Sequence, residues 1–148
     1  MKKMKKGCLF SLVFLLCVCT FLGNASAAHV EETRIDYADG SYAIISIEIA
    51  SDTRAATEDS KTYTFYNSSR QRCFSYTLFG QFTYSGTTSS ADSTDFDIAI
   101  YRRGWDVVSH DEYTSGDTAY GEAVFSGPNG EERTVELSLT CDADGNVS

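Results

Sequence analysis

The sequence predicts an all-β protein, an antiparallel β-sandwich of immunoglobulin-like architecture with about seven short strands. A small β-barrel is the alternative. Three observations predict this class. Beyond residue 27, apolar and polar residues alternate with a period of two, no long apolar period of 3.6 residues occurs, and turn residues recur between the alternating runs.

The first predicted strands carry isoleucine and aromatic residues on one face. Ile45, Ile47 and Ile49 alternate with Ser46 and Glu48 after an Asp-Gly turn. Tyr63 and Phe65 alternate with threonines before the turn at residues 67–69. The polar stretch 53–60 between these strands predicts a surface loop, and the segment around His29 predicts a flexible start of the mature chain.

The clearest strand is CFSYTLFGQFTY, residues 73–84. One face carries only apolar and aromatic side chains, namely Phe74, Tyr76, Leu78, Phe82 and Tyr84. Gly80 predicts a bulge or bend in this strand. The Gly- and Ser-containing stretch 85–93 predicts a loop. Apolar and polar residues alternate again at Phe96, Ile98 and Ile100, so the two strands form a predicted hairpin.

The last two predicted strands flank a strong turn. Alternation over residues 118–125 is followed by Gly127-Pro128-Asn129-Gly130, in which Pro presets φ and Gly accepts positive φ. The final strand places Val135, Leu137, Leu139 and Cys141 on its inner face. These two strands form a second predicted hairpin.

Residues 1–27 predict a secretory signal peptide. Four lysines precede an uncharged apolar stretch from Cys8 to Leu22, and Ala25-Ser26-Ala27 supplies small residues for cleavage. The apolar stretch is shorter than the roughly 20 residues of a membrane-spanning helix. We therefore predict a secreted, extracellular protein with one mature domain, residues 28–148, and no membrane insertion after cleavage.

The charge of the mature chain limits its partners. The formal net charge is −9, and loss of the four signal lysines would make it −13. Such a surface repels phosphate backbones, so nucleic acid is not an expected partner. A protein or glycan ligand remains open.

Several stretches resemble a family of small secreted proteins of Gram-positive bacteria. The matching segments are DYADGSY at 36–42, KTYTFYN at 61–67, GQFTYSG at 80–86, Tyr101 to Trp105, and LTCDADGNVS at 139–148. The family has no assigned activity, cofactor or catalytic residue, so the resemblance implies none here. Relatives place a cysteine before the strand at Phe96, whereas this chain has SSAD, so no disulfide pattern is carried over.

Cys73 and Cys141 are the cysteines that remain after cleavage, and we predict a disulfide between them from the oxidising location. Cys141 alternates with inward residues. Cys73 alternates with Ser75 and Thr77, so it would face away from the core unless a bulge near Arg72 turned it.

No metal or cofactor is predicted. The ending DADGN starts like a calcium loop, because Asp142, Asp144 and Asn146 occupy ligand positions, but Val147 replaces the required glycine and no position 12 follows. Weak cation binding by the acidic surface stays open.

No catalytic residue is predicted either. His110 stands beside two carboxylates, Asp111 and Glu112, which could suggest a base with its orienter. Neighbours on a strand point to opposite faces, so His110 and Asp111 would diverge, and the sequence contains no nucleophile-elbow motif. A triad assembled from distant segments stays open.

Aromatic residues give the best functional lead. Tyr101 and Tyr120 fall out of phase with the inward residues of their strands, which predicts exposed rings suited to a glycan or protein ligand. Trp105 could serve the same site, although the core is its favoured place. The sequence thus predicts a non-catalytic binding module at or outside the cell envelope. The alternatives are a small extracellular hydrolase using His110 and a structural or assembly subunit.

Overall fold

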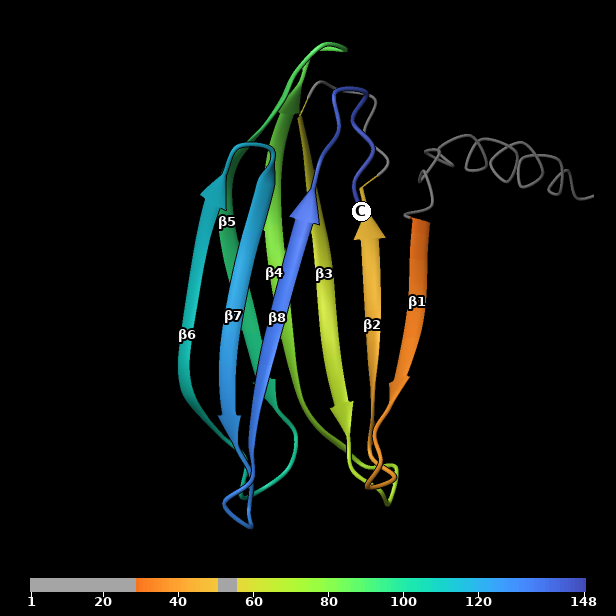
Figure 1. Ribbon diagram of the computed structural model, residues 1–148, viewed down its shortest axis with the longest axis vertical. Helices are drawn as coiled ribbons and strands as arrows, with labels where there is room; N and C mark the ends of the chain where they lie inside the picture. Colours follow the sequence, from red (N-terminus) through yellow and green to blue (C-terminus); the bar gives the residue numbers. More distant parts are fainter. Residues whose placement is uncertain (1–28, 51–55) are drawn as a thin grey trace, which may run out of the picture.

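The computed structural model describes residues 29–50 and 56–148, and this part of the chain forms two antiparallel sheets packed face to face (Figure 1). The larger sheet contains β1 His29–Asp36, β2 Tyr42–Ile49, β3 Ala56–Tyr66, β4 Arg72–Tyr84 and β5 Ser89–Ile100. The smaller sheet contains β6 Asp106–Ser115, β7 Thr118–Ser126 and β8 Glu132–Thr140. The predicted sandwich is confirmed, and the sheets do not close into a barrel. The predicted signal peptide lies outside the described residues.

Each sheet is a meander. The strand order is β1-β2-β3-β4-β5 in the larger sheet and β6-β7-β8 in the smaller one, so neighbours in sequence are neighbours in space. The chain changes sheets once, between β5 and β6, and none of the described strands makes a Greek-key crossing. Short connections account for this order, because antiparallel neighbours need only a tight turn.

Three predicted irregular segments are strands instead. The segment at His29 belongs to β1, which pairs with β2 over its full length. The polar stretch 53–60 was expected to be a loop, but β3 begins at Ala56, and residues 51–55 lie outside the described part. β5 begins at Ser89, inside the predicted loop 85–93. Backbone pairing with a neighbour supports these polar segments, so an apolar pattern was not needed to place them.

Asp59 shows how a polar residue fits inside β3. It is 1% exposed, and its carboxylate accepts a hydrogen bond of 2.8 Å from the backbone N–H of Ala50. A buried carboxylate is tolerated when hydrogen bonds replace its water shell. Alternation of apolar and polar residues along a strand contains no information about such a hydrogen-bond partner.

The core lies between the sheets and follows the predicted inner faces. Its fully buried large side chains include Phe65, Phe74, Tyr76, Leu78, Phe82, Phe125 and Leu139. Each such side chain contributes about 1.5–3 kcal/mol by leaving water. Gly121 on β7 makes room for this layer, because a Cβ there would overlap the Tyr76 hydroxyl and lie 2.8 Å from Leu78 Cδ1.

Gly80 has a similar spacing role, which differs from the predicted bulge. A Cβ on Gly80 would lie 2.7 Å from the Phe82 ring. The extra residue of the nearby bulge is Asp92 on β5, because Gln81 pairs with Ser93 and Phe82 pairs with Ala91. The glycine therefore serves packing, and the partner strand carries the irregularity.

The smaller sheet covers only part of the larger one. β8 packs beside β3, and β2 and β1 extend past its edge in Figure 1. Ile45 and Ile47 on the inner face of β2 are only partly buried. Among the described residues, no helix is long and apolar enough to cross a membrane.

Candidate functional site

Four connections meet at one end of the sandwich, the lower end in Figure 1. They are residues 37–41, 67–71, 101–105 and 127–131. Together with adjoining strand ends, these turns enclose a cleft of about 310 Å³, here called the loop-end cleft. Its lining residues include Asp39, Ser41, Asn67, Arg102, Trp105, Glu131 and Arg133. The cleft thus combines residues from both sheets.

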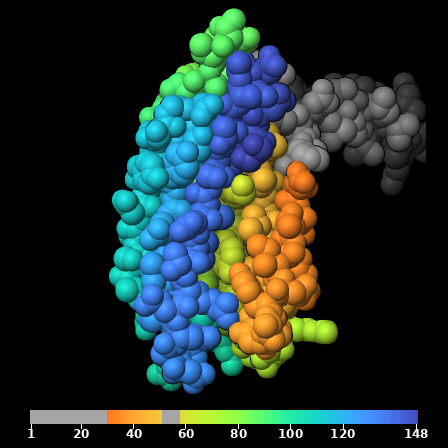
Figure 2. All heavy atoms as spheres, in the orientation of Figure 1, coloured from red at the N-terminus to blue at the C-terminus, as the bar shows by residue number. Residues whose placement is uncertain are grey.

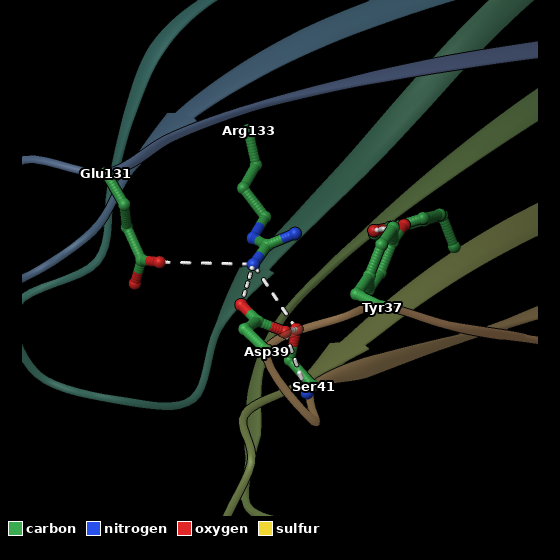
Figure 3. Close-up of polar contacts among 6 residues, drawn as sticks. Tyr37, Asp39, Ser41, Glu131 and Arg133 are labelled. Carbon is green, nitrogen blue, oxygen red and sulfur yellow. Dashed lines mark hydrogen bonds and ion pairs between the residues drawn. The ribbon is translucent and has the colours of Figure 1, made fainter.

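Arg133 on β8 is the centre of this cleft (Figure 3). Its Nη2 donates to Asp39 Oδ2 at 2.9 Å and to the Ser41 hydroxyl at 3.3 Å. Glu131 Oε2 lies 4.0 Å from the same nitrogen. Because Asp39 and Ser41 belong to the turn between β1 and β2, this guanidinium links the two sheets.

Aromatic rings line the other side of Arg133. Its Cζ lies 4.2 Å from the centre of the Phe65 ring and 4.9 Å from that of Tyr37. Such cation–π contacts contribute about 0.5–2 kcal/mol, more when water is excluded. The Tyr37 hydroxyl is 2.8 Å from that of Tyr63, whose pKa is raised by burial and by this hydrogen bond. The Arg133 side chain is therefore held from several directions.

The Asp39 carboxylate also forms hydrogen bonds within its own turn. Its Oδ1 accepts hydrogen bonds from the Ser41 hydroxyl and from the Ser41 backbone N–H, the latter at 2.9 Å. These bonds, followed by the attraction of Arg133, lower the pKa of Asp39. Arg133 and Asp39 thus form a clamp between the sheets, although the Arg133 Nε is buried without a hydrogen-bond partner in the described part of the chain.

Trp105 lies beneath the cleft and belongs to the core. It is 4% exposed, and its ring centre lies 5.4 Å from that of Phe65 and 4.9 Å from that of Phe74. The core position favoured for Trp105 is confirmed. A buried indole offers no open ring face to a ligand.

Tyr101 is exposed, as its phase predicted. Half of its surface is accessible, and its hydroxyl is 3.3 Å from the Ser75 hydroxyl. The Arg72 guanidinium covers one side of the ring, with Cζ 4.6 Å from its centre. Tyr101 lies in the connection after β5, whereas Tyr120 lies on β7.

The ring of Tyr120 was predicted to be exposed, but it is half-buried on the outer face of β7, where it pairs directly with Tyr113 on β6. The two rings stack, with centres 5.0 Å apart and planes 16° apart, and Tyr113 is 54% exposed. The sequence contained a signal for this pair, because both residues lie at equal distances from the turn at 116–117. We call this pair and its surroundings the tyrosine face.

Three carboxylates flank the tyrosine face. Glu122 lies directly opposite Asp111 on one side and Glu136 on the other, so the acids form a row across all strands of the smaller sheet. The row and the tyrosines line a hollow of about 320 Å³. Within the described chain, none of the three acids has an ion-pair partner. Like charges directly opposite one another destabilise a sheet, so this row carries a cost.

His110 contacts the second of the two carboxylates that follow it in the sequence. Its Nδ1 is 3.3 Å from Glu112 Oε2, whereas Asp111 points to the opposite face as expected. The other oxygen of Glu112 accepts a 3.0 Å bond from the Tyr76 hydroxyl, and burial together with this carboxylate raises the pKa of Tyr76. In the part of the chain described, the hydrogen bonds of His110 include no serine or cysteine.

The predicted disulfide does not form. Cys73 and Cys141 are both buried free thiols, and burial raises the pKa of each. Cys73 begins β4, whereas Cys141 lies beside Ser89, which pairs with the last residue of β4. A strand of 13 residues separates them by roughly 40 Å at about 3.3 Å per residue, far beyond the reach of a disulfide.

A bulge explains why Cys73 is buried although its phase predicted the opposite. Phe65 pairs with Phe74, but Tyr66 pairs with Arg72, so Cys73 is the extra residue on β4. A bulge turns the side chain at this position out of the normal alternation. The bulge near Arg72 that the sequence analysis left open is present, but it does not bring the cysteines together.

The terminal acidic segment is a turn held by its own first carboxylate. Asp142 Oδ1 accepts hydrogen bonds of 2.9 Å from the backbone N–H groups of Asp144 and Asn146. Bonds from Asn146 are the main reason that the pKa of Asp142 is lowered. Across residues 29–50 and 56–148, no three His, Cys, Asp or Glu side chains are arranged to hold a metal ion.

Comparison with known proteins adds no relative: no protein-family model, curated protein or solved structure matches this chain.

Proposed function

We propose that this protein is exported and acts by binding, and that its ligand is a cationic segment of a protein held on the tyrosine face. The exposed ring of Tyr113, stacked on the half-buried ring of Tyr120 beside three carboxylates without an ion-pair partner, carries this proposal. Tyrosines provide rigid contact area at low entropic cost, and carboxylates pair with ammonium and guanidinium groups.

The loop-end cleft supports a ligand less well. Arg133 and Asp39 already bond one another and their neighbours, so a ligand would have to break those contacts. By contrast, a cation on the tyrosine face would relieve repulsion within the acid row. The charge of the mature chain would also attract a basic partner over distance.

A neutral glycan is the second candidate, favoured by the exposed ring of Tyr113 next to carboxylates that can accept hydroxyl hydrogen bonds. The dependence of binding on salt concentration distinguishes the two candidate ligands. Binding of a cation weakens as ionic strength rises, whereas stacking of a sugar ring does not depend on screening.

The hydrolase alternative has less support than binding. His110 is oriented by Glu112, but an acyl-transfer mechanism also needs a nucleophile within hydrogen-bond reach. The other alternative, an assembly subunit, would pair with other chains through its sheet edges, and this is compatible with a binding role.

Calorimetric titration with capped oligolysine tests the proposal. We expect saturable binding that weakens about tenfold or more between low and physiological salt. Tyr113→Ala should weaken it by about 0.5–2 kcal/mol through loss of cation–π contact, and Tyr101→Ala is the matched control because its tyrosine is equally exposed.

Equal losses in the two variants would contradict the tyrosine face as the site. Binding of a neutral glycan array with no oligolysine response would favour the second candidate. Secretion itself is tested separately, by expressing the full chain and determining the N-terminal residue of the protein in the medium, which should be Ala28.

A further inference from the structure

The outer edge of β8 presents backbone groups that no other strand uses along most of its length. Thr140 exchanges two 3.1 Å hydrogen bonds with Ser148 on this side. Because alternate residues of a strand point their N–H and C=O groups to the same edge, those of Ser138, Glu136 and Thr134 point there too. Among the described residues, no strand pairs with β8 at these positions.

An uncovered inner surface of the larger sheet lies next to that edge. Figure 2 shows a hollow between β8 and the paired strands β1 and β2, with β3 recessed between them. Ile45 and Ile47 are partly buried on this inner surface, and Ile35 on β1 is 38% exposed. The isoleucines of this surface lie beside Thr33 and Lys61, which the register places on the same face. The surface is bounded on one side by the free edge of β8. We call this region the β8 slot.

Residues Val147 and Ser148 show how a strand fits the slot. Val147 forms an antiparallel bridge with Cys141 and is 7% exposed, so its side chain faces the core. Ser148 lies opposite Thr140 with its side chain exposed. The first two positions therefore already alternate apolar inward and polar outward, in the antiparallel direction.

Lys61 marks the next backbone acceptor along the edge. Its Nζ reaches from the inner face of β3 and donates a 3.1 Å hydrogen bond to the carbonyl of Ser138. An added strand would offer a backbone N–H to the same carbonyl. Inward-pointing lysines also protect sheet edges against unwanted pairing, but this one covers a single carbonyl and leaves Glu136 and Thr134 open.

We infer that the β8 slot accepts an extended segment of a partner protein as an additional antiparallel strand. The segment has apolar side chains facing Ile45 and Ile47 and basic side chains on the outer face beside Glu136. The larger sheet has two more strands than the smaller one, so the added strand takes a position that the fold leaves vacant. This inference shares Glu136 with the tyrosine face but rests on a different feature, the free backbone edge of β8.

The acidic side chains of β1 and β8 argue against a second copy of this chain as the occupant of the β8 slot. The edge strand β1, which a second copy could offer, contains Glu31, Glu32 and Asp36 against a single arginine. The outer face of β8 presents Glu132 and Glu136. Acidic strands would repel one another there, whereas a basic outward face is complementary.

The register makes the inference testable with a synthetic peptide. In an antiparallel pair, a residue directly opposite Glu136 shares its outward side-chain direction and also points its N–H toward β8. In a capped peptide of alternating lysine and valine, the lysine amides should therefore face β8 and the valine amides should face solvent. N-methylation of lysine amides should abolish docking, and N-methylation of valine amides should leave it intact.

The readout is hydrogen exchange of the purified protein with each peptide. We expect the unmodified and valine-methylated peptides to slow exchange at Glu136 and Ser138 at least tenfold, and the lysine-methylated peptide to have no effect. Thr134→Pro should abolish protection, because the Thr134 N–H points out of the sheet and proline removes it without loss of a β7 hydrogen bond, and Thr134→Ala is the control.

Equal protection by the two methylated peptides, or protection confined to β1 or β6, would overturn the inference. Tyr113→Ala distinguishes it from the proposed function. If the peptide still slows exchange of the Glu136 amide in this variant, the β8 slot is a separate site. If the variant loses both this slowed exchange and binding at the tyrosine face, the peptide binds only the tyrosine face.

Discussion

Arg133 at the loop end and the acid row on the smaller sheet treat charge in opposite ways. Arg133 lies against two rings and donates to Asp39 and Ser41, so its charge is matched by neighbours from the other sheet. Asp111, Glu122 and Glu136 lie side by side without an ion-pair partner in the described chain.

The difference separates structural charge from available charge. A matched charge between layers stabilises their packing, and removing one partner leaves the other unsatisfied. Unmatched like charges on an exposed face cost stability and are free to meet a ligand. Substitutions in the two regions should therefore change stability in opposite directions.

Removal of the ring beneath the loop end should have the largest effect. We expect Trp105→Ala to lower the free energy of unfolding by about 3–5 kcal/mol, because it leaves a cavity beside Phe65 and Phe74. Urea denaturation followed by circular dichroism measures this loss. Trp105→Phe keeps part of the ring and should cost less. A loss below about 1 kcal/mol would show that the loop end is not part of the core.

Removal of the guanidinium should come next. Arg133→Met keeps apolar volume but removes the cation–π contacts with Phe65 and Tyr37, and we expect a loss of about 0.5–2 kcal/mol. Arg103→Met is the control, since Arg103 is exposed on the connection between β5 and β6, and it should change stability by less than about 0.5 kcal/mol. Similar losses in both variants would argue against the clamp.

Neutralising the acid row should change stability in the other direction. Glu122→Gln removes repulsion toward the acids on both sides, so we expect a gain of about 0.2–1 kcal/mol that shrinks as salt is added. Glu132→Gln removes an exposed charge outside the row and serves as the comparison. A loss of stability on Glu122→Gln would mean that the row has a structural partner.

Acid should weaken the clamp through Asp39. Its pKa is lowered in the folded protein, first by the Ser41 hydroxyl, then by the Ser41 N–H and Arg133. The stabilising contribution is thus complete above the ordinary carboxyl pKa, and it is lost as pH falls through the lowered folded value. Unfolding measured over a pH series should show a larger loss of stability in acid for the natural protein than for Asp39→Asn, in which Asp142 still contributes. Parallel pH profiles of the natural protein and the variant would contradict this role of Asp39.

The inner faces of the strands were predictable because alternation and burial share one physical cause. Phe74, Tyr76 and Leu78 are apolar at every second position, and a sheet with one buried face requires that spacing. Turns containing Gly or Pro were equally clear, since few residues accept their backbone angles. The core position of Trp105 was also predictable, because its large ring has much apolar area to bury.

Strand pairing at polar segments was not readable from the sequence. β1 carries mostly polar residues, and it is a strand because β2 supplies hydrogen bonds along its length. The start of β3 depends in the same way on β4, and Asp59 accepts a hydrogen bond from the backbone N–H of Ala50. Local composition contains no information about such distant partners.

The sequence by itself determined the all-β class, the alternation of the core and the exposure of Tyr101, because each follows from local periodicity. Only the tertiary structure decided the burial of Cys73, where one extra residue in β4 reverses the phase, and its separation from Cys141. It also brought Asp111, Glu122 and Glu136 into one row and left the edge of β8 open. These features depend on register and on which strands lie side by side, and both are set by contacts between residues distant in the chain.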